Sequence, residues 1–384
     1  MKTIYEQSIE MHGELHGKLE VVSKVPLTNK EELSLAYTPG VAGVCELIAN
    51  DSSKARTHTL KRNTVAIVSD GTAILGLGDL GPLAAIPVME GKAAIFKTFG
   101  GVDAFPICLD TKDTEEIIKA VKQIAPVFGG INLEDISAPR CFEIEERLRK
   151  ELDIPVMHDD QWGAATVILS ALINAFKISG KDKTKAKVVF SGVGAAGVAT
   201  GRLLLAYGIS NIIFCDSHGI IHKNRNDLTK EKLELISAST LNPNEGELKD
   251  ALVEADVFIG LSKANIVTEE MVKGMNPNPI IFALANPNPE ILPDKAKEAG
   301  AFIVATGRSD YPNQINNSLV FPNAFKAMLD FQIPQFENKI FTTIAEALAK
   351  VVENPTVDRI IPSMFDAGVK EAVYNAVASL SSWK

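Results

Sequence analysis

The chain is poor in cysteine and has no long apolar run. Its four cysteines, Cys45, Cys108, Cys141 and Cys215, are widely spaced and form neither a C-x-x-C pair nor a Cys/His ligand pattern. This excludes the common zinc-site motifs and predicts reduced thiols. No stretch approaches the roughly 20 apolar residues that cross a bilayer, and residues 1–24 lack the apolar core of a signal peptide. We therefore expect a cytoplasmic protein with no membrane partner.

Positive charge is also in short supply. The chain has 39 Lys and Arg residues against 48 Asp and Glu, a formal net charge of −9. This argues against a nucleic-acid partner, because phosphate binding favours a basic surface. A small anionic substrate remains compatible, since one lysine can dominate a cleft whatever the net charge. The glycine-rich stretch 76–81 is not followed by G-K-[ST], which excludes a P-loop.

Strand-like and helix-like stretches alternate over most of the 384 residues, and the length suggests two domains. Such alternation predicts an α/β fold with a doubly wound parallel sheet. A polar stretch at 181–187 marks the boundary region between the domains. The expected elements are helices 2–20, 41–50, 114–124, 162–178, 195–207 and a helical tail 338–383, a hairpin of strands 64–69 and 74–77, and strands 105–109, 187–191, 211–215, 255–259, 279–283 and 301–306.

Two short apolar runs each end in a pair of carboxylates. Glu134-Asp135 follows Ile131–Leu133, and Asp159-Asp160 follows Ile154–His158. Helices are expected to begin soon after each pair, so simple helix capping is one interpretation. The other is a metal site, because neighbouring parallel strands place their carboxyl ends at one edge of a sheet. All-oxygen ligands suit Mg²⁺ or Mn²⁺ rather than zinc.

A dinucleotide-type glycine loop begins at Gly192. Gly192, Gly194 and Gly197 lie between an expected strand and an expected helix, and Asp216 follows 19 residues after Gly197 at the next strand tip. This set allows a tight turn, close approach of the pyrophosphate and a hydrogen bond to the adenosine ribose. Asp216 favours NAD over NADP, because a carboxylate repels a 2′-phosphate. His218 and Lys223 lie near enough to weaken that preference, so NADP stays open.

Four further residues are candidates with ordinary alternatives. Lys92 lies between apolar segments, where burial near other cations would lower its pKa toward that of a useful base; alternatively it is a solvated lysine. Tyr37 precedes Thr-Pro-Gly; the alternative to a functional role is an ordinary core tyrosine with a satisfied hydroxyl. Asn286 follows a buried strand and Asn317 precedes an apolar run, and both could be simple turn residues.

Taken together, these motifs resemble the malic enzyme family in its short bacterial and archaeal form. They occur in the family's order and span about residues 20 to 325. The matching segments are Ala36–Val41, Leu75–Gly81, Gly91-Lys92, Glu134-Asp135, Asp159–Gly163, Gly192–Gly197, Asn286-Pro287 and Asn316-Asn317. The resemblance implies an N-terminal catalytic and metal-binding α/β domain (1–160), a Rossmann-type NAD-binding domain (161–335) and C-terminal helices (336–384) that pack back on the first domain.

The resemblance also implies a reaction, the NAD- and metal-dependent oxidative decarboxylation of (S)-malate to pyruvate and CO₂, carried out by a homodimer. Lys92 would be the base for the C2 hydroxyl, Tyr37 the acid that protonates C3, and Asp159 a supporting residue. The other implied contacts are Glu134, Asp135 and Asp160 for Mg²⁺ or Mn²⁺; Gly192, Val193, Gly194, Ala195, Ala196, Gly197, Asp216 and Asn286 for the cofactor; and Tyr37, Lys92, Asn286 and Asn317 for the substrate.

One position departs from the family pattern. Larger members have a substrate-binding arginine just before the Ile-Leu-Gly-Leu-Gly segment, where this chain has Ala73. Three other functions stay open on the same residues: decarboxylation of oxaloacetate without net oxidation, a malolactic reaction that yields lactate, and a non-catalytic NAD sensor. Pyruvate, lactate and NADH as measured products would separate them.

Overall fold

The computed structural model describes residues 2–241 and 243–381, and it contains two parallel sheets. The first sheet has the strand order β2-β1-β3-β4. Its strands are β1 (Thr64–Ser69), β2 (Asp103–Cys108), β3 (Gly130–Leu133) and β4 (Val156–His158). The order reverses between β1 and β3, and such a switch point opens a crevice at the carboxyl ends of the strands. The α/β class expected from the sequence is confirmed.

The second sheet has the order β10-β9-β8-β5-β6-β7, with only the short β7 antiparallel. Its strands are β5 (Val188–Ser191), β6 (Ile212–Asp216), β7 (Gly219–Ile220), β8 (Val257–Gly260), β9 (Ile280–Ala283) and β10 (Ile303–Thr306). Strand order reverses between β5 and β8, as in a doubly wound dinucleotide-binding sheet. The central strands are buried along their whole length, because helices cover both faces of a parallel sheet.

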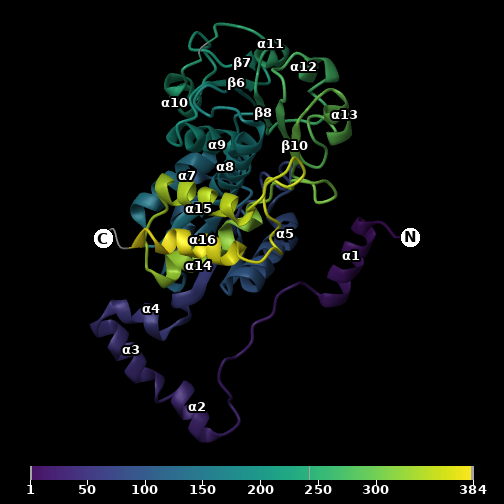
Figure 1. Cartoon of the computed structure of the whole chain (residues 1–384). Helices are drawn as coiled ribbons and strands as arrows, with labels where there is room; N and C mark the ends of the chain where they lie inside the picture. The colour runs from purple at the N-terminus through teal and green to yellow at the C-terminus, as the bar shows by residue number, and fades with distance from the viewer. Residues whose placement is uncertain (1, 242, 382–384) are drawn as a thin grey trace.

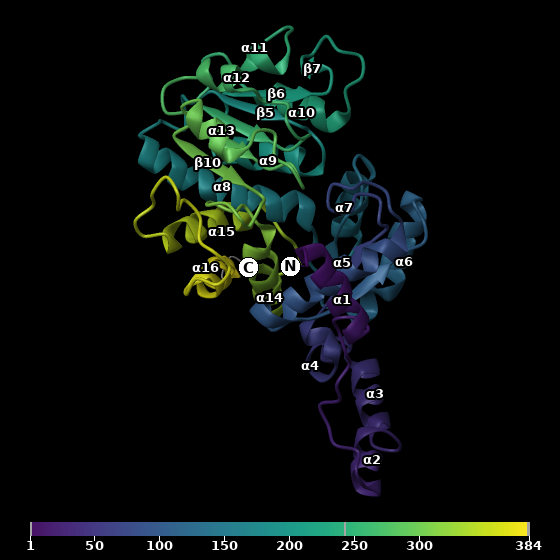
Figure 2. The same cartoon turned by 90° about the vertical axis from the view of Figure 1, so that its right-hand side faces the viewer.

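The helices of the main body lie around these sheets, as Figures 1 and 2 show. The α-helices are α5 (Pro82–Ile95), α6 (Thr114–Ile124), α7 (Arg140–Glu151), α8 (Asp159–Ser179), α9 (Ala195–Ala206), α10 (Lys230–Ala238), α11 (Leu248–Leu252), α12 (Glu269–Lys273), α13 (Pro293–Glu298), α14 (Phe321–Asp330), α15 (Asn338–Val351) and α16 (Val369–Ala378). The shorter turns are Ser52–Lys54, Leu60–Asn63, Ala125–Val127, Asn317–Leu319 and a π turn at Phe96–Gly100.

Helix α8 lies between the two sheets. Side chains such as Leu169 and Leu172 belong to one buried cluster that includes Ile67 of the first sheet and Phe190 of the second. Contrary to the expectation from the sequence, one stretch, α8, is long and apolar enough to cross a membrane, but 72% of its apolar window is buried inside the protein. The helix is therefore a core element. The C-terminal helix α15 packs on α8, and Phe341 stacks on Trp162 at a centroid distance of 4.9 Å.

The N-terminal helices form no core of their own. They are α1 (Ile4–Leu15), α2 (Lys30–Ala36), α3 (Val41–Asn50) and α4 (Ala55–His58). None of the described residues 2–63 is buried. In both views α2 and α3 project far beyond the rest of the chain (Figures 1 and 2). We call residues 24–58 the arm.

The expected hairpin of strands 64–69 and 74–77 is wrong. Strand β1 pairs in parallel with β2 on one side and β3 on the other, so it has no free edge for residues 74–77. The side chain of Asp70 instead accepts hydrogen bonds from the backbone and the hydroxyl of Thr72, and these bonds shape a loop.

Several helix boundaries also differ from those expected. The first helix ends at Leu15, and the helices after the acidic pairs begin at Arg140 and Asp159. The expected helical tail 338–383 is divided into α15 and α16, with residues 352–368 between them. The end of that tail, residues 382–383, lies outside the described residues.

Candidate active site

The two acidic pairs lie side by side at the carboxyl edge of the first sheet. Leu133, the last residue of β3, pairs in register with His158, the last residue of β4. The residues that follow these strands therefore emerge together. Glu134, Asp135 and Asp160 each offer one carboxylate oxygen, and these oxygens all lie within 4.8 Å of one another. The sequence expectation that the pairs share one edge is correct.

Lys92 of α5 is inserted among these carboxylates. Its Nζ donates hydrogen bonds to Glu134 Oε1 and Asp159 Oδ2, each at 2.5 Å, and lies 4.6 Å from the centre of the Phe321 ring. The lysine side chain is only 8% exposed. The alternative interpretation as a solvated surface lysine is therefore excluded.

The charge state of Lys92 differs from the expectation. Burial lowers its pKa, but the carboxylates of Asp159 and Glu134 raise it by more, so the pKa lies well above its ordinary value. The expected lowering of this pKa is wrong, because the neighbours of Lys92 are carboxylates and not cations. In the protein without ligands Lys92 is an ammonium ion.

Asp159 is held tightly on its buried side. Its Oδ2 also accepts a hydrogen bond of 2.6 Å from Asn317 Nδ2, which brings Asn317 to the site. A Cβ atom at position 163 would lie 1.9 Å from Asp159 Oδ1, so only glycine fits beside this carboxylate. The glycine of the Asp159–Gly163 segment thus has a packing reason.

Helix capping does not explain the acidic pairs. The N-cap of α8 is His158 and that of α7 is Pro139, and neither makes a side-chain capping bond. Burial, and next the charge of Asp160, raise the pKa of Asp135 to about 7 and also raise that of Glu134. Oδ2 of Asp135 and Oδ1 of Asp159 are buried and have no hydrogen-bond partner among the residues that the structure describes. Four clustered carboxylates with one ammonium fit a divalent cation bound through oxygen.

The glycine loop has the geometry of a dinucleotide site. Gly192 has φ +102°, and a Cβ there would lie 2.4 Å from the Leu261 carbonyl oxygen of the neighbouring strand end. Gly197 lies against Gly192, since a Cβ added at Gly197 would be 2.2 Å from the backbone oxygen of Gly192. Gly194, by contrast, faces open space at the start of α9. An open helix N-terminus of this kind accommodates a pyrophosphate.

Two glycines of this loop should respond differently to the same substitution. Gly194→Val should leave the melting temperature nearly unchanged, because φ is −88° and a Cβ at this position would have no atom of the described residues within 4 Å. It should weaken NAD binding by about tenfold or more, since the side chain would occupy the space of the pyrophosphate. Gly197→Val should cost about 1–3 kcal/mol of unfolding free energy through overpacking. Calorimetric titration with NAD and thermal unfolding check this, and unchanged NAD affinity of Gly194→Val would contradict it.

The remaining predicted residues lie in three places. Asp216 ends β6 beside the glycine loop, where the Gly192 N–H bonds to the Cys215 carbonyl. Asn286 follows β9 and meets loops from both sheets, since Cβ atoms at Gly76 and Gly307 would contact it at 2.6 and 3.1 Å. Tyr37 lies on the arm, 67% exposed, and is not brought to Lys92 within one chain.

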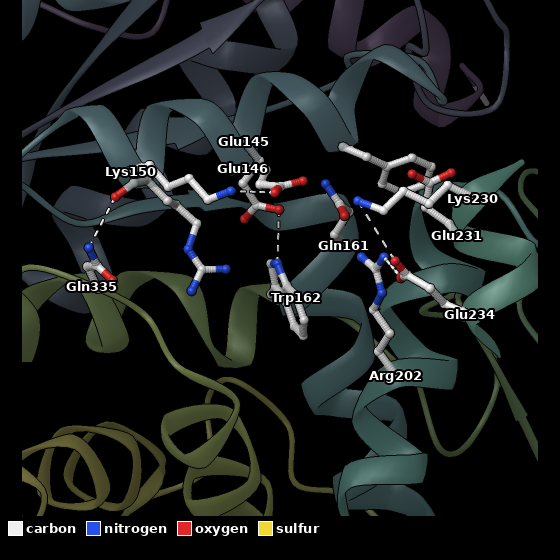
Figure 3. A pocket seen from close by; sticks show the side chains of 12 residues that line it. Glu145, Glu146, Lys150, Gln161, Trp162, Arg202, Lys230, Glu231, Glu234 and Gln335 are labelled. Carbon is white, nitrogen blue, oxygen red and sulfur yellow. Dashed lines mark hydrogen bonds and ion pairs between the residues drawn. The ribbon is translucent and has the colours of Figure 1, made fainter. Parts of the chain in front are cut away.

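One supporting residue, Glu145, was not predicted from the sequence. Buried Glu145 of α7 accepts hydrogen bonds from the His158 N–H and from Trp162 Nε1, both at 3.0 Å. It therefore fixes the chain on each side of the Asp159-Asp160 pair. Glu145 and Trp162 line a cavity of about 380 Å³ that Arg202 and Lys230 also line. Figure 3 shows these side chains. A glutamate on an amphipathic helix gives no signal of such a role.

Comparison with known proteins agrees with this geometry. Residues 16–149 match the malic enzyme N-terminal domain, and residues 162–379 match the malic enzyme NAD binding domain. An NAD-dependent malic enzyme of Geobacillus stearothermophilus is 54% identical over 97% of this chain and 78% of its own length. A bifunctional malic/malolactic enzyme of Bacillus subtilis (strain 168) is 51% identical over 98% of this chain and 92% of its length.

Solved structures show the same relationship. The NAD-dependent malic enzyme from Thermotoga maritima has a TM-score of 0.93 and 48% identity, covering 96% of this chain and 98% of that one. The malic enzyme from Pyrococcus horikoshii has a TM-score of 0.94 and 45% identity, covering 99% and 91%. Both domains, in order and over nearly the whole length, place this chain in the malic enzyme family.

Proposed function

We propose that this protein oxidises (S)-malate with NAD and decarboxylates it to pyruvate and CO₂, with the help of a divalent cation. The observation that carries the proposal is the position of Lys92. Its Nζ is buried between Glu134 and Asp159, at the edge where Asp135 and Asp160 also gather. A dinucleotide loop stands in the same chain, and NAD-dependent relatives are about half identical to it.

Each residue has a distinct task in this proposal. Lys92, in its neutral amine form, takes the proton of the C2 hydroxyl. Asp159 holds the lysine in place and is itself held by Asn317. Asn286 and Asn317 contact the substrate carboxylate and the nicotinamide region. Tyr37 donates a proton to C3 after CO₂ has left. Positioned proton transfer of this kind contributes about 10²–10⁴-fold in rate.

Glu134, Asp135 and Asp160 would hold Mg²⁺ or Mn²⁺, and the Gly192–Gly197 loop would hold NAD. NAD would supply the hydride acceptor for C2. The cation would supply positive charge that offsets the carboxylates around Lys92, so that the lysine can give up its own proton before it takes that of the substrate. Without that positive charge, the four carboxylates would repel a dianionic substrate.

Asp160→Ala should abolish metal-dependent activity and weaken Mn²⁺ binding, because one of three clustered carboxylates is lost. NAD affinity should stay nearly the same. Asp153→Ala is the matched control, since this exposed aspartate lies at the opposite end of β4. Calorimetric titrations with Mn²⁺ and with NAD measure both affinities. A parallel loss of both would show that Asp160 supports the fold rather than the ion.

We also propose a homodimer in which each arm completes the site of the other copy. The arm carries Tyr37 and exposes Leu27, Leu33, Leu35 and Leu47. A segment of this length without one buried residue gains too little apolar burial to hold its position alone. A second copy suits it, because a two-fold dimer presents the same surface twice and exchanges both arms at once.

A malolactic reaction is the second candidate, because a relative at 51% identity is named a bifunctional malic/malolactic enzyme. Incubation with malate, NAD and Mn²⁺ separates the candidates. Pyruvate with an equal amount of NADH supports oxidative decarboxylation, and lactate without net NADH supports the malolactic reaction. Activity on oxaloacetate alone would instead favour a decarboxylase without net oxidation.

A further inference from the structure

The carboxylate of Asp216 has no free acceptor position in the structure. Oδ1 accepts hydrogen bonds from the His218 backbone N–H and from Arg225 Nη1, both at 2.9 Å. Oδ2 accepts from Arg225 Nη2 at 2.9 Å and from Lys232 Nζ at 2.7 Å. An ionised carboxylate has about four acceptor sites. All of them are used, so Asp216 is not a bare negative group at the tip of β6.

The surrounding cations are themselves well placed. The side chains of Asp216, Arg225 and Lys232 are 10%, 9% and 19% exposed. Burial alone would raise the pKa of Asp216. The hydrogen bonds from Arg225 and Lys232 lower this pKa by more than burial raises it, and the result is a pKa of about 2. Asp227 pairs with the outer side of Arg225 at 2.5 Å. Of the two residues expected from the sequence to affect cofactor preference, His218 lies beside the cluster, with Nδ1 3.9 Å from Asp216 Oδ1, but the hydrogen-bonding cations are Arg225 and Lys232.

The pairing of Asp216 with Arg225 and Lys232 changes the physical explanation for a preference for NAD over NADP. A simple repulsion between Asp216 and a 2′-phosphate would need an uncompensated carboxylate, whereas here two cations flank one anion. A forked arginine, a lysine and a backbone N–H are also the donors that typically bind a phosphate. The carboxylate therefore occupies a ready-made anion position beside the dinucleotide loop.

We infer that Arg225 and Lys232 determine cofactor specificity: they bind Asp216 when the chain uses NAD, and they form a 2′-phosphate site for NADP when that carboxylate is removed. The inference rests on the proposed function only in assuming that the adenosine ribose lies at the tip of β6. Asp216 and the 2′-phosphate compete for the same donors. The cluster of Asp216, His218 and Asp227 is not a metal site in this view, because Arg225 already pairs with both carboxylates.

Binding of nucleotide fragments tests the inference without any turnover. The intact protein is titrated calorimetrically with 2′,5′-ADP and with 5′-AMP, which lacks the 2′-phosphate. Asp216→Ser should bind 2′,5′-ADP about tenfold or more tightly than the unmodified protein does, since two charged donors become available. Asp216→Ser combined with Arg225→Gln should lose most of this gain. Asp216→Asn, which keeps the side-chain shape, provides a second test if the serine variant is unstable.

The outcomes separate this inference from the proposed function. A gain with Asp216→Ser that Arg225→Gln removes supports the inference. The inference is wrong if neither Asp216 variant binds 2′,5′-ADP more tightly. It is also wrong if the tighter binding persists after Arg225→Gln and Lys232→Met. Neither result would contradict malate oxidation with NAD. If the unmodified protein binds neither fragment, the dinucleotide site itself is misassigned, and both proposals fall.

Discussion

A heterodimer of a Tyr37→Phe chain and a Lys92→Ala chain should have about half the activity of the unmodified dimer, although each variant alone is nearly inactive. Tyr37 lies on the arm, which projects away from the rest of its own chain. Lys92 lies in the remainder of the chain, which we call the body. If arms are exchanged, one of the two sites combines an intact body with an intact arm. The other site carries both substitutions. Co-expression with two different affinity tags allows the heterodimer to be purified and assayed.

The matched control is a heterodimer of Tyr37→Phe with the unmodified chain. It should retain about half the activity whether or not the arms are exchanged. The double-variant heterodimer distinguishes the two arrangements, because Tyr37 acting within its own chain would leave both sites defective. An inactive double-variant heterodimer together with a half-active control would rule out the exchange.

Lys92→Ala should lower kcat for malate oxidation by about 10²–10⁴-fold, the range typical of a lost general base. The buried carboxylates of Glu134 and Asp159 would also lose their common partner. Thermal unfolding and NAD titration therefore accompany the assay, to show that the variant is folded. Partial recovery by added small amines would support proton transfer by this residue.

Lys92→Arg is the informative companion variant. Arginine keeps the positive charge between the two carboxylates but does not give up its proton in proteins. If Lys92 acts as a base, the arginine variant should be nearly as inactive as the alanine variant. If arginine restored most of the activity, the lysine would serve only to neutralise Glu134 and Asp159.

The fold and the acidic cluster could be predicted because both depend on periodic patterns. Buried strands alternate with helices, and parallel strands deliver the residues that follow them to one edge, so Glu134-Asp135 and Asp159-Asp160 could be placed together from spacing alone. The prediction of a hairpin of strands 64–69 and 74–77 was wrong for a non-local reason. A turn motif does not reveal that both edges of β1 are already paired with β2 and β3.

Electrostatic partners were less predictable than positions. The sign of the Lys92 pKa shift depends on carboxylates 42 and 67 residues away in sequence, which a local reading of the apolar flanks cannot supply. Arg225 lies in a loop with no motif, and only the structure shows its two bonds to Asp216. The exposed position of Tyr37 on the arm could not follow from the motif around it, because a local turn motif does not specify what the segment packs against.

Helix α8 has a consequence for how the protein melts. The helix begins with Asp159 and Asp160 at the edge of the first sheet, and its later residues belong to a large apolar cluster. That cluster also includes side chains of both sheets, which therefore share one buried network. Separate thermal transitions require parts that can lose their packing independently. Here the loss of either sheet would expose apolar residues of α8 that support the other. We therefore expect the body of the protein to unfold cooperatively, and excised NAD-binding segments beginning after residue 180 to be poorly stable.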